Sequence, residues 1–355
     1  MLFVDLPDGS SADDCSEIAL IVAGDGLLEL KVEGGRHVAP QDIDGAIASM
    51  VTAVSRLALD ADPERLHLHC AGLSLDGKGV LISAASGTGK TTLAAALTRR
   101  GWSYVSDEAV ALESDSSTAF GFPKPLGIKP SGRDLVPELA AGRVDLGLVD
   151  ELWWHVPARS LAAAVETELT PSVIVILHRA PDGSTDTVSV ATPIHPVDAV
   201  VALMGQTMDP QRFGAHAVAV LANLAARCSC VTLPVGPLDA AASVLEQLAK
   251  STVEVDEVEE FERTAASDTG VHPWQVSDSV RSVRIGDRVV VHETEGGAIA
   301  GLDEAGSAVW RALYGSPPAW WEPEMMQSSG TRAFLDQLVS HGMLFRSDPE
   351  KPTEA

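Results

Sequence analysis

Aromatic residues are scarce in this sequence: they make up only 5% of its 355 residues, although hydrophobic residues as a whole make up 45%. A core assembled from such a chain must consist mainly of Ala, Val and Leu. The composition is that of a globular chain and excludes a disordered one. A chain of this length usually folds into two or three domains.

Basic side chains are also in deficit. The chain carries 25 Lys and Arg against 50 Asp and Glu, which gives a formal net charge of −25. A phosphate backbone or an anionic lipid surface would repel such a chain, so we expect no nucleic-acid partner and no membrane partner. Any phosphate group that it binds has to be held by a local arrangement of donors and cations.

Cysteines and long apolar runs are scarce as well. Cys15, Cys70, Cys228 and Cys230 are irregularly spaced and do not form a disulfide framework or a common zinc or redox pair, so we expect reduced packing residues. No apolar run reaches the roughly 20 residues of a membrane-spanning helix, and no basic flank with an apolar run opens the chain. These absences favour a cytoplasmic protein.

Four stretches of different composition indicate the domain organisation. Residues 1–65 contain short apolar runs and an amphipathic pattern, which predict a small N-terminal α/β lobe. Residues 66–250 alternate apolar strands with helical stretches, the pattern of an α/β layer. Residues 251–279 are acidic with few core positions, and we expect a solvated linker. Residues 280–347 are expected to form a separate small unit.

The N-terminal lobe has the clearest secondary-structure pattern outside the central block. The runs Ile18–Val22 and Leu27–Val32 predict two strands. Apolar residues at three- and four-residue intervals predict a helix over Ile43–Leu59, with Asp42 as its cap.

The sharpest local signal is a phosphate-binding loop of the P-loop type. It lies between an apolar strand predicted over Gly79–Ser83 and a helix predicted over Thr92–Arg99. Ala84 stands where the first glycine of the usual pattern is expected. We expect the nucleotide to be bound by the loop and the start of the helix: Ser86, Gly87, Thr88, Gly89, Lys90, Thr91 and Thr92.

Each part of the loop has a physical role. Gly87 and Gly89 permit positive φ and let backbone amides approach phosphate oxygens. Lys90 can reach the β- and γ-phosphates, and the Thr91 hydroxyl can bind Mg²⁺. The helix directs the positive end of its dipole at the phosphates.

Two acidic residues follow the helix by one short strand. Tyr104-Val105 predicts a strand beside the P-loop strand, which would place Asp107 and Glu108 near the γ-phosphate at its carboxyl end. In phosphoryl transfer one carboxylate can accept the proton of the attacking hydroxyl while another binds the metal. The alternative is that the pair only caps a helix or forms a solvated turn.

Together these residues resemble the HPr kinase/phosphorylase family over about Leu66–Leu248. The matching motifs are His69 before the strand, the loop Ser86–Thr91, Arg99-Arg100-Gly101 after the helix, and Val105-Ser106-Asp107-Glu108. The resemblance implies a kinase that uses ATP and Mg²⁺. It also implies that Asp107 is the general base toward a serine hydroxyl and that Glu108 lies near the metal.

The sequence departs from that family at several positions. An Asp-Glu pair replaces Asp-Asp, Lys124 replaces the Arg of an Arg-Gly-Leu-Gly-Ile segment, and Phe122 replaces a metal-linked Glu. The segment Pro157–Leu161 resembles a later Gly-Arg-Asn stretch, which implies that Arg159 stabilises the charge of the transferred phosphate. These departures favour the HPr-kinase-like proteins of peptide-modification systems over a bifunctional HPr enzyme.

The last unit supports a peptide substrate. Val280–Phe345 resembles a PqqD-like peptide-recognition domain, a winged-helix-like α/β unit, although Ser316–Gly330 departs from the usual second helix. The resemblance implies that a leader peptide adds as a strand to an exposed sheet edge. The expected partner is a precursor peptide or another serine-bearing acceptor, and the family resemblance also suggests a homo-oligomer.

Three functions therefore remain open. The leading hypothesis is an ATP- and Mg²⁺-dependent kinase that phosphorylates a serine on a peptide. The alternatives are a small-molecule kinase or carboxykinase-like phosphotransferase, and a non-catalytic nucleotide-dependent scaffold. Trp153-Trp154-His155 could cover a base or an acceptor but is more typical of packing. His178 and Arg179, which follow the buried run Val173–Leu177, could reach the site.

Overall fold

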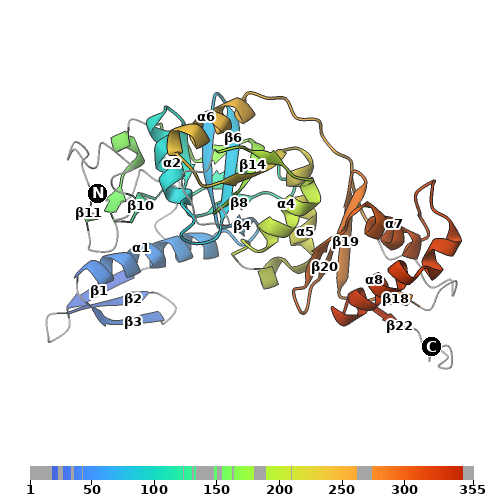
Figure 1. Cartoon of the computed structure of the whole chain (residues 1–355). Coiled ribbons are helices and arrows are strands. Elements are labelled where there is room, and N and C mark those ends of the chain that lie inside the picture. The colour runs from blue at the N-terminus through green and yellow to red at the C-terminus, as the bar shows by residue number, and fades with distance from the viewer. Residues whose placement is uncertain are drawn as a thin grey trace.

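The computed structural model describes residues 18–22, 27–32, 36–41, 43–122, 124–129, 132, 148–149, 154–161, 164–179, 189–208, 210–261 and 274–346. These residues form a mixed α/β structure, which confirms the α/β part of the predicted fold class (Figure 1). None of the helices found in these ranges is long and apolar enough to cross a membrane.

A six-stranded sheet forms the centre of the chain, in the spatial order β15 (Thr192–Pro193), β16 (Ser229–Pro234), β14 (Pro171–His178), β6 (Lys78–Ala84), β5 (Cys70–Leu75) and β7 (Ser103–Ser106). Helices α2 (Lys90–Arg99) and α6 (Leu238–Ala249) pack on one face, and helices α4 (Pro196–Met204) and α5 (Pro210–Ala226) pack on the other. Strands β6, β14 and β16 are parallel. The middle parts of β6 and β14 are buried on both faces and mainly apolar, whereas β16 is partly exposed at Ser229 and Thr232.

The strand next to the P-loop strand β6 is β5, so the predicted pairing of β6 with Tyr104-Val105 is wrong. Strands β5 and β6 form a hairpin through Asp76-Gly77, where both residues have positive φ (51° and 75°) and match the twist of the strands. Strand β7 pairs antiparallel with the other edge of β5. Two antiparallel steps restore the direction, so the carboxyl end of β7 still lies at the P-loop edge.

Two smaller sheets flank this centre. One has the order β13 (Glu168–Leu169), β9 (Ala119–Gly121), β8 (Val110–Leu112) and β4 (Leu66–Leu68), and the other has the order β10 (Leu126–Ile128), β12 (Trp154–Val156) and β11 (Leu148–Val149). The chain between β9 and β10 passes the end of β7, where the Ser106 hydroxyl donates to the Phe122 carbonyl at 3.1 Å. This contact brings Lys124 to the acid pair.

The N-terminal lobe consists of a three-stranded meander and one long helix; the sequence predicts the helix and the first two strands but not the third. The strands are β1 (Ile18–Val22), β2 (Leu28–Val32) and β3 (Arg36–Gln41), and the helix α1 covers Ile43–Asp60. The helix packs on β2 and β3 and extends from them to the central block (Figure 1). Asp42, its predicted cap, lies outside the described residues.

The C-terminal unit contains a sheet with the order β17 (Val258–Glu260), β19 (Val280–Ile285), β20 (Arg288–Glu293) and β21 (Ile299–Gly301). Helices α7 (Glu304–Leu313) and α8 (Ser329–Ser340) pack on it, and β18 (Trp274–Val276) pairs with β22 (Leu344–Arg346). Strand β17 comes from the acidic segment, so part of the stretch predicted as a solvated linker pairs with β19 instead.

The C-terminal sheet docks on the central block rather than standing apart from it. Val283, Ile285 and Val290 belong to the same buried cluster as the apolar residues of α4 and α5. At the border of this contact, Arg288 donates to both carboxylate oxygens of Asp198 on α4, each at 2.8 Å. The two units therefore share a core and a bidentate ion pair.

Candidate active site

The P-loop joins the end of β6 to the start of α2. Gly87 and Gly89 have φ of 77° and 120°, conformations that L side chains rarely adopt, while an added Cβ would meet no atom within 4 Å. Glycine is thus required there by backbone conformation and not by lack of space. The Leu93 amide donates to the Gly89 carbonyl at 2.9 Å, so the loop runs directly into the helix. The first amides of α2 are left to bind an anion.

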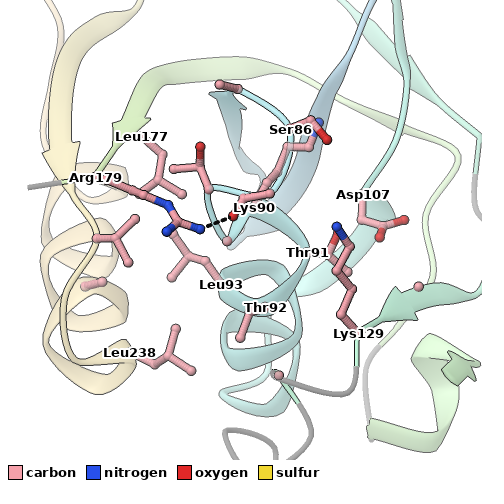
Figure 2. A pocket seen from close by; sticks show the side chains of 18 of the residues that line it. Ser86, Lys90, Thr91, Thr92, Leu93, Asp107, Lys129, Leu177, Arg179 and Leu238 are labelled. Carbon is pink, nitrogen blue, oxygen red and sulfur yellow. Dashed lines mark hydrogen bonds between the residues drawn. The ribbon is translucent and has the colours of Figure 1, made fainter. Parts of the chain in front are cut away.

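A cavity of about 730 Å³ opens in front of this loop at the carboxyl edge of the sheet (Figure 2). Among the described residues its walls carry two carboxylates and four cations: Lys90, Lys124, Lys129 and Arg179. In a chain with a net charge of −25, this is a local excess of positive charge. It is the arrangement that a polyphosphate needs, because the chain as a whole repels anions.

One wall of the cavity is apolar. It is formed at the ends of β14 and β16 and at the first turn of α6, by Leu177, Val235, Pro237, Leu238 and Ala241. In Figure 2 this wall lies on the opposite side of α2 from Asp107. A flat aromatic base suits such a surface, with the phosphates then reaching over the loop toward the carboxylates.

The opposite wall of the cavity is acidic, and its central residue is Asp107, which is 2% exposed. Its carboxylate lies 3.0 Å from Nζ of Lys124 and accepts a hydrogen bond from the Tyr104 hydroxyl at 2.9 Å and another from the Thr91 hydroxyl. The last contact ties the carboxylate to the residue after the P-loop lysine. The interpretation of the pair as a solvated turn is excluded for Asp107, because a solvated turn would leave it exposed.

This environment keeps Asp107 ionised. Burial raises the pKa of Asp107, but Lys124 and the hydrogen bonds from Tyr104 and Thr91 outweigh it, so the pKa lies below its ordinary value of 3.8. Burial lowers the pKa of Lys124, and the two neighbouring carboxylates outweigh that effect and raise it. Both members of the ion pair are therefore charged at neutral pH.

Glu108 lies in a different environment from its neighbour. Its side chain is 43% exposed, 3.3 Å from Nζ of Lys124 and 3.9 Å from Nε2 of His69. Burial, followed by the charge of Lys90, lowers the pKa of His69 below 6.5, so this ring is neutral at pH 7. Glu108 is thus an accessible carboxylate beside a neutral imidazole.

A backbone carbonyl holds the side chain of Lys90 in place. Its ammonium donates to the His69 carbonyl at 3.3 Å, and burial is the main effect that lowers its pKa. A bound phosphate would raise the pKa of the ammonium again, because opposite charge favours the charged form. The lysine is therefore positioned for an anion above the loop.

The cavity offers a hydroxyl and a carboxylate as oxygen donors for a metal, the kind of ligand that Mg²⁺ prefers when it also binds a nucleotide. The Thr91 hydroxyl and the Asp107 carboxylate are in contact, and P-loop enzymes use such a Ser/Thr and Asp pair to hold Mg²⁺. Within the described ranges no three or more His, Cys, Asp or Glu residues form a metal cluster. Mg²⁺ does not need one, because it takes one or two carboxylates plus phosphates and water.

The predicted site residues are brought together with one exception. The loop residues Ser86–Thr92, Asp107 and Glu108 line the same cavity. Arg159 does not: it is exposed on the 3-10 helix Ala158–Leu161, which packs against α2 away from the cavity. Arg179 lies there instead, and its guanidinium donates to the Gly87 carbonyl at 2.7 Å.

Two residues of the site had no role in the sequence-based prediction. Lys124 bridges the two carboxylates, and Tyr104 donates to Asp107 while also donating to the Lys124 carbonyl at 2.8 Å. Lys124 stands at the family's Arg position, and that substitution was the signal that could have identified it. Tyr104 lies three positions from Asp107, but a strand pattern does not show that its hydroxyl turns to that carboxylate, and its second acceptor is 20 positions away.

The residues of the Trp153-Trp154-His155 segment do not share one environment. Trp154 packs against the core beside α2 and α6, which fits the packing interpretation, while His155 is buried and lines a second cavity near Glu108. Trp153 lies outside the described residues. Phe122 lines the same second cavity and not the larger cavity in front of the P-loop.

No family model matches the sequence, and no curated protein matches it significantly. Among solved structures, the chain is similar to the Hpr(Ser) kinase/phosphatase from Coxiella burnetii, at 16% sequence identity and a TM-score of 0.28. That alignment covers 51% of this chain and 94% of the other. A similarity of this size says nothing about the reaction, and what the site can do follows from its own residues.

Proposed function

We propose that the protein is an ATP- and Mg²⁺-dependent kinase that transfers the γ-phosphate to a serine hydroxyl, with a precursor peptide as the substrate. The observation that carries this proposal is the acid pair. A nucleotide-binding loop alone serves many functions, but here Asp107 and Glu108 line the same cavity as Lys90 and Thr91. A purely non-catalytic scaffold has no need of two carboxylates beside the phosphates.

The transfer step uses groups that the cavity already holds. The acceptor oxygen forms a bond to the γ-phosphorus, the bond from that phosphorus to the bridging oxygen of ADP breaks, and a carboxylate takes the hydroxyl proton. Lys90 and the loop amides bind the phosphates, and Arg179, next to Gly87, is placed to stabilise the charge in place of Arg159. Thr91 and Asp107 would hold Mg²⁺, which neutralises phosphate charge when bound.

The geometry favours exchanging the two carboxylate roles that the family resemblance implies. Asp107 is buried, paired with Lys124 and hydrogen-bonded by Thr91, which suits a metal-binding and positioning group. Glu108 is half-exposed and beside neutral His69, which suits a group that meets an incoming hydroxyl. We therefore propose that Glu108 accepts the proton and that Asp107 positions the metal.

The C-terminal unit supports a peptide substrate through its resemblance to PqqD-like domains. If it recruits a leader peptide, its docking on α4 and α5 would hold that peptide next to the kinase block. A small-molecule kinase or carboxykinase-like phosphotransferase is the alternative, since the same cavity could serve it.

The test is a transfer assay on the full chain. The protein is incubated with ATP, MgCl₂ and either a serine-bearing precursor peptide or free L-serine, and the products are analysed by intact mass and by ADP release. Phosphorylation of the peptide is expected. ATP binding with transfer to free L-serine alone would favour the small-molecule alternative, and binding without any transfer or hydrolysis would favour the scaffold.

A further inference from the structure

A second cavity, of about 340 Å³, adjoins the nucleotide cavity. The two share Glu108 and Lys124, whereas Asp107 and the P-loop line only the first. Glu108 and Lys124 thus form a common wall with phosphates expected on one side. A group that occupies the second cavity would contact the accessible carboxylate from the side away from the apolar base wall.

One side of this cavity is a single face of the N-terminal helix α1. Thr52, Ser55, Arg56 and Leu59 line it, and their spacing of three, four and seven residues places them in one stripe. The helix also packs on β2 and β3, and the other residues that line this cavity belong to the central block. The N-terminal lobe therefore contributes directly to a space that opens on the candidate active site.

The opposite side comes from separate segments of the central block. Ala109 follows the acid pair, Phe122 precedes Lys124, His155 lies on β12, and Met208 follows α4. The Met208 amide donates to the His67 carbonyl at 2.9 Å, and the His69 amide donates to the Gln206 carbonyl at 2.8 Å. Backbone hydrogen bonds thus fix the Met208 part of this wall against the chain from β4 to β5, which contains His67 and His69.

We propose that this second cavity binds the acceptor, a serine-bearing peptide segment whose hydroxyl points at Glu108. The inference rests on the proposed kinase function and names the place where its substrate enters. An in-line attacking oxygen has to approach the γ-phosphorus from the side opposite the ADP leaving oxygen. The second cavity meets the first at Glu108 and Lys124, away from the apolar wall proposed for the base, and α1 supplies one of its sides.

The size and lining of the cavity favour a peptide over serine itself. A cavity of about 150 Å³ holds benzene, and this one has more than twice that volume, enough for a serine and a flanking side chain. Leu59, Phe122 and Met208 offer apolar contacts for that flanking side chain. Thr52 and Ser55 lie on the same lining and make the α1 side of the cavity more polar. We therefore expect a serine with an apolar neighbour.

The experiment fills the cavity from α1 in the full-length protein. Ser55→Trp and Leu59→Trp are prepared one turn apart, with Ala61→Trp as the matched control, because Ala61 is exposed just beyond α1 and does not line the cavity. Ser55→Ala keeps the space open. The acceptors are acetylated, amidated pentapeptides with a central serine that has either leucine or aspartate beside it, and free L-serine.

The Trp substitutions at positions 55 and 59 are expected to raise KM for the leucine-flanked peptide by about tenfold or more, equivalent to about 1.4 kcal/mol of binding free energy. The Kd for ATP should not change, and Ala61→Trp should alter the peptide KM by no more than about twofold. Ser55→Ala, which keeps the space open, should raise the peptide KM much less than Ser55→Trp does. The melting temperature of each variant shows which of the two Trp variants is folded and can be interpreted.

Three results would overturn the inference. A wild-type peptide KM in the folded Trp variants would show that the acceptor binds elsewhere. Transfer to free L-serine in preference to every pentapeptide would exclude the peptide class. ATP binding without transfer to any of these acceptors would refute the proposed acceptor site but not the proposed nucleotide site. Failure to bind ATP, in contrast, would refute the proposed kinase function itself.

Discussion

The two ends of the candidate site are built in different ways. The phosphate end is a single contiguous segment, in which one strand, one loop and one helix supply the glycines, Lys90 and Thr91. The proposed acceptor end is assembled from segments far apart in the chain: helix α1, Glu108 and Ala109, the connection that carries Phe122 and Lys124, strand β12 and the residues after α4.

This difference has a physical basis. A phosphate is recognised by backbone amides and one lysine, which a short loop can present by its own conformation. A peptide side chain needs a cavity with several walls, which only tertiary packing can form. The two ends should therefore respond differently to mutation: the phosphate end through nucleotide affinity, and the acceptor end through peptide KM, proton transfer and stability.

The largest effect is expected at the phosphate end. Lys90→Met removes the cation that the loop presents to the β- and γ-phosphates, and we expect transfer to fall by about a thousandfold and ATP affinity to weaken. Calorimetric titration with ATP and a transfer assay measure the two quantities. Lys78→Met is the control, because Lys78 is exposed at the start of β6, the end of that strand that lies away from the P-loop. Wild-type transfer by Lys90→Met would exclude the P-loop from the reaction.

Glu108→Gln tests the carboxylate that faces both cavities. Loss of a proton acceptor is expected to lower kcat by about a hundredfold while ATP affinity is retained. Glu113→Gln is a matched control, since Glu113 has a similar exposure, 39%, and lines neither cavity. If Glu108→Gln keeps its kcat and Asp107→Asn loses it, the proton acceptor is Asp107, as the family resemblance implies.

Asp107→Asn should act mainly on stability and on the Mg²⁺ requirement. It removes one partner of a buried ion pair, which typically costs about 3 kcal/mol of unfolding free energy. Because the pKa of Asp107 lies below its ordinary value, its stabilising effect is present above about pH 4 and is lost as the pH falls through the folded-state pKa.

Urea unfolding at several pH values checks this sign. The difference in unfolding free energy between the wild type and Asp107→Asn should be largest near neutral pH and should shrink in acid. Asp336→Asn, at a side chain that is 65% exposed, should show little difference at any pH. If the difference in unfolding free energy between the wild type and Asp107→Asn increased in acid, the assigned direction of the pKa shift would be contradicted.

The smallest effect is expected at the contact between the C-terminal unit and α4. Arg288→Gln breaks a bidentate but partly exposed ion pair with Asp198, and we expect a loss of about 1 kcal/mol with unchanged ATP affinity. A double-mutant cycle with Asp198→Asn measures the coupling. A coupling energy of zero would show that this ion pair does not contribute to the docking.

Much of the fold could be predicted because it depends on local patterns. The helix over Ile43–Leu59, the strand over Gly79–Ser83 and the buried run Val173–Leu177 all appear where their periodicity or apolar content places them. The order of strands in the sheet could not be predicted in the same way. The hairpin through Asp76-Gly77 places β5 between β6 and β7, and sequence order alone does not reveal it.

The sequence by itself determined the phosphate end of the site, because positive φ at two glycines, one lysine and a helix start are properties of neighbouring residues. It also placed Asp107 and Glu108 at that end, through the length of one helix and one strand. Only the tertiary structure decided that Lys124 and Tyr104 bury Asp107, that Glu108 stays accessible, and that Arg179 and not Arg159 lies at the loop. Burial and charge pairing depend on residues distant in sequence, and they set the chemistry of these side chains.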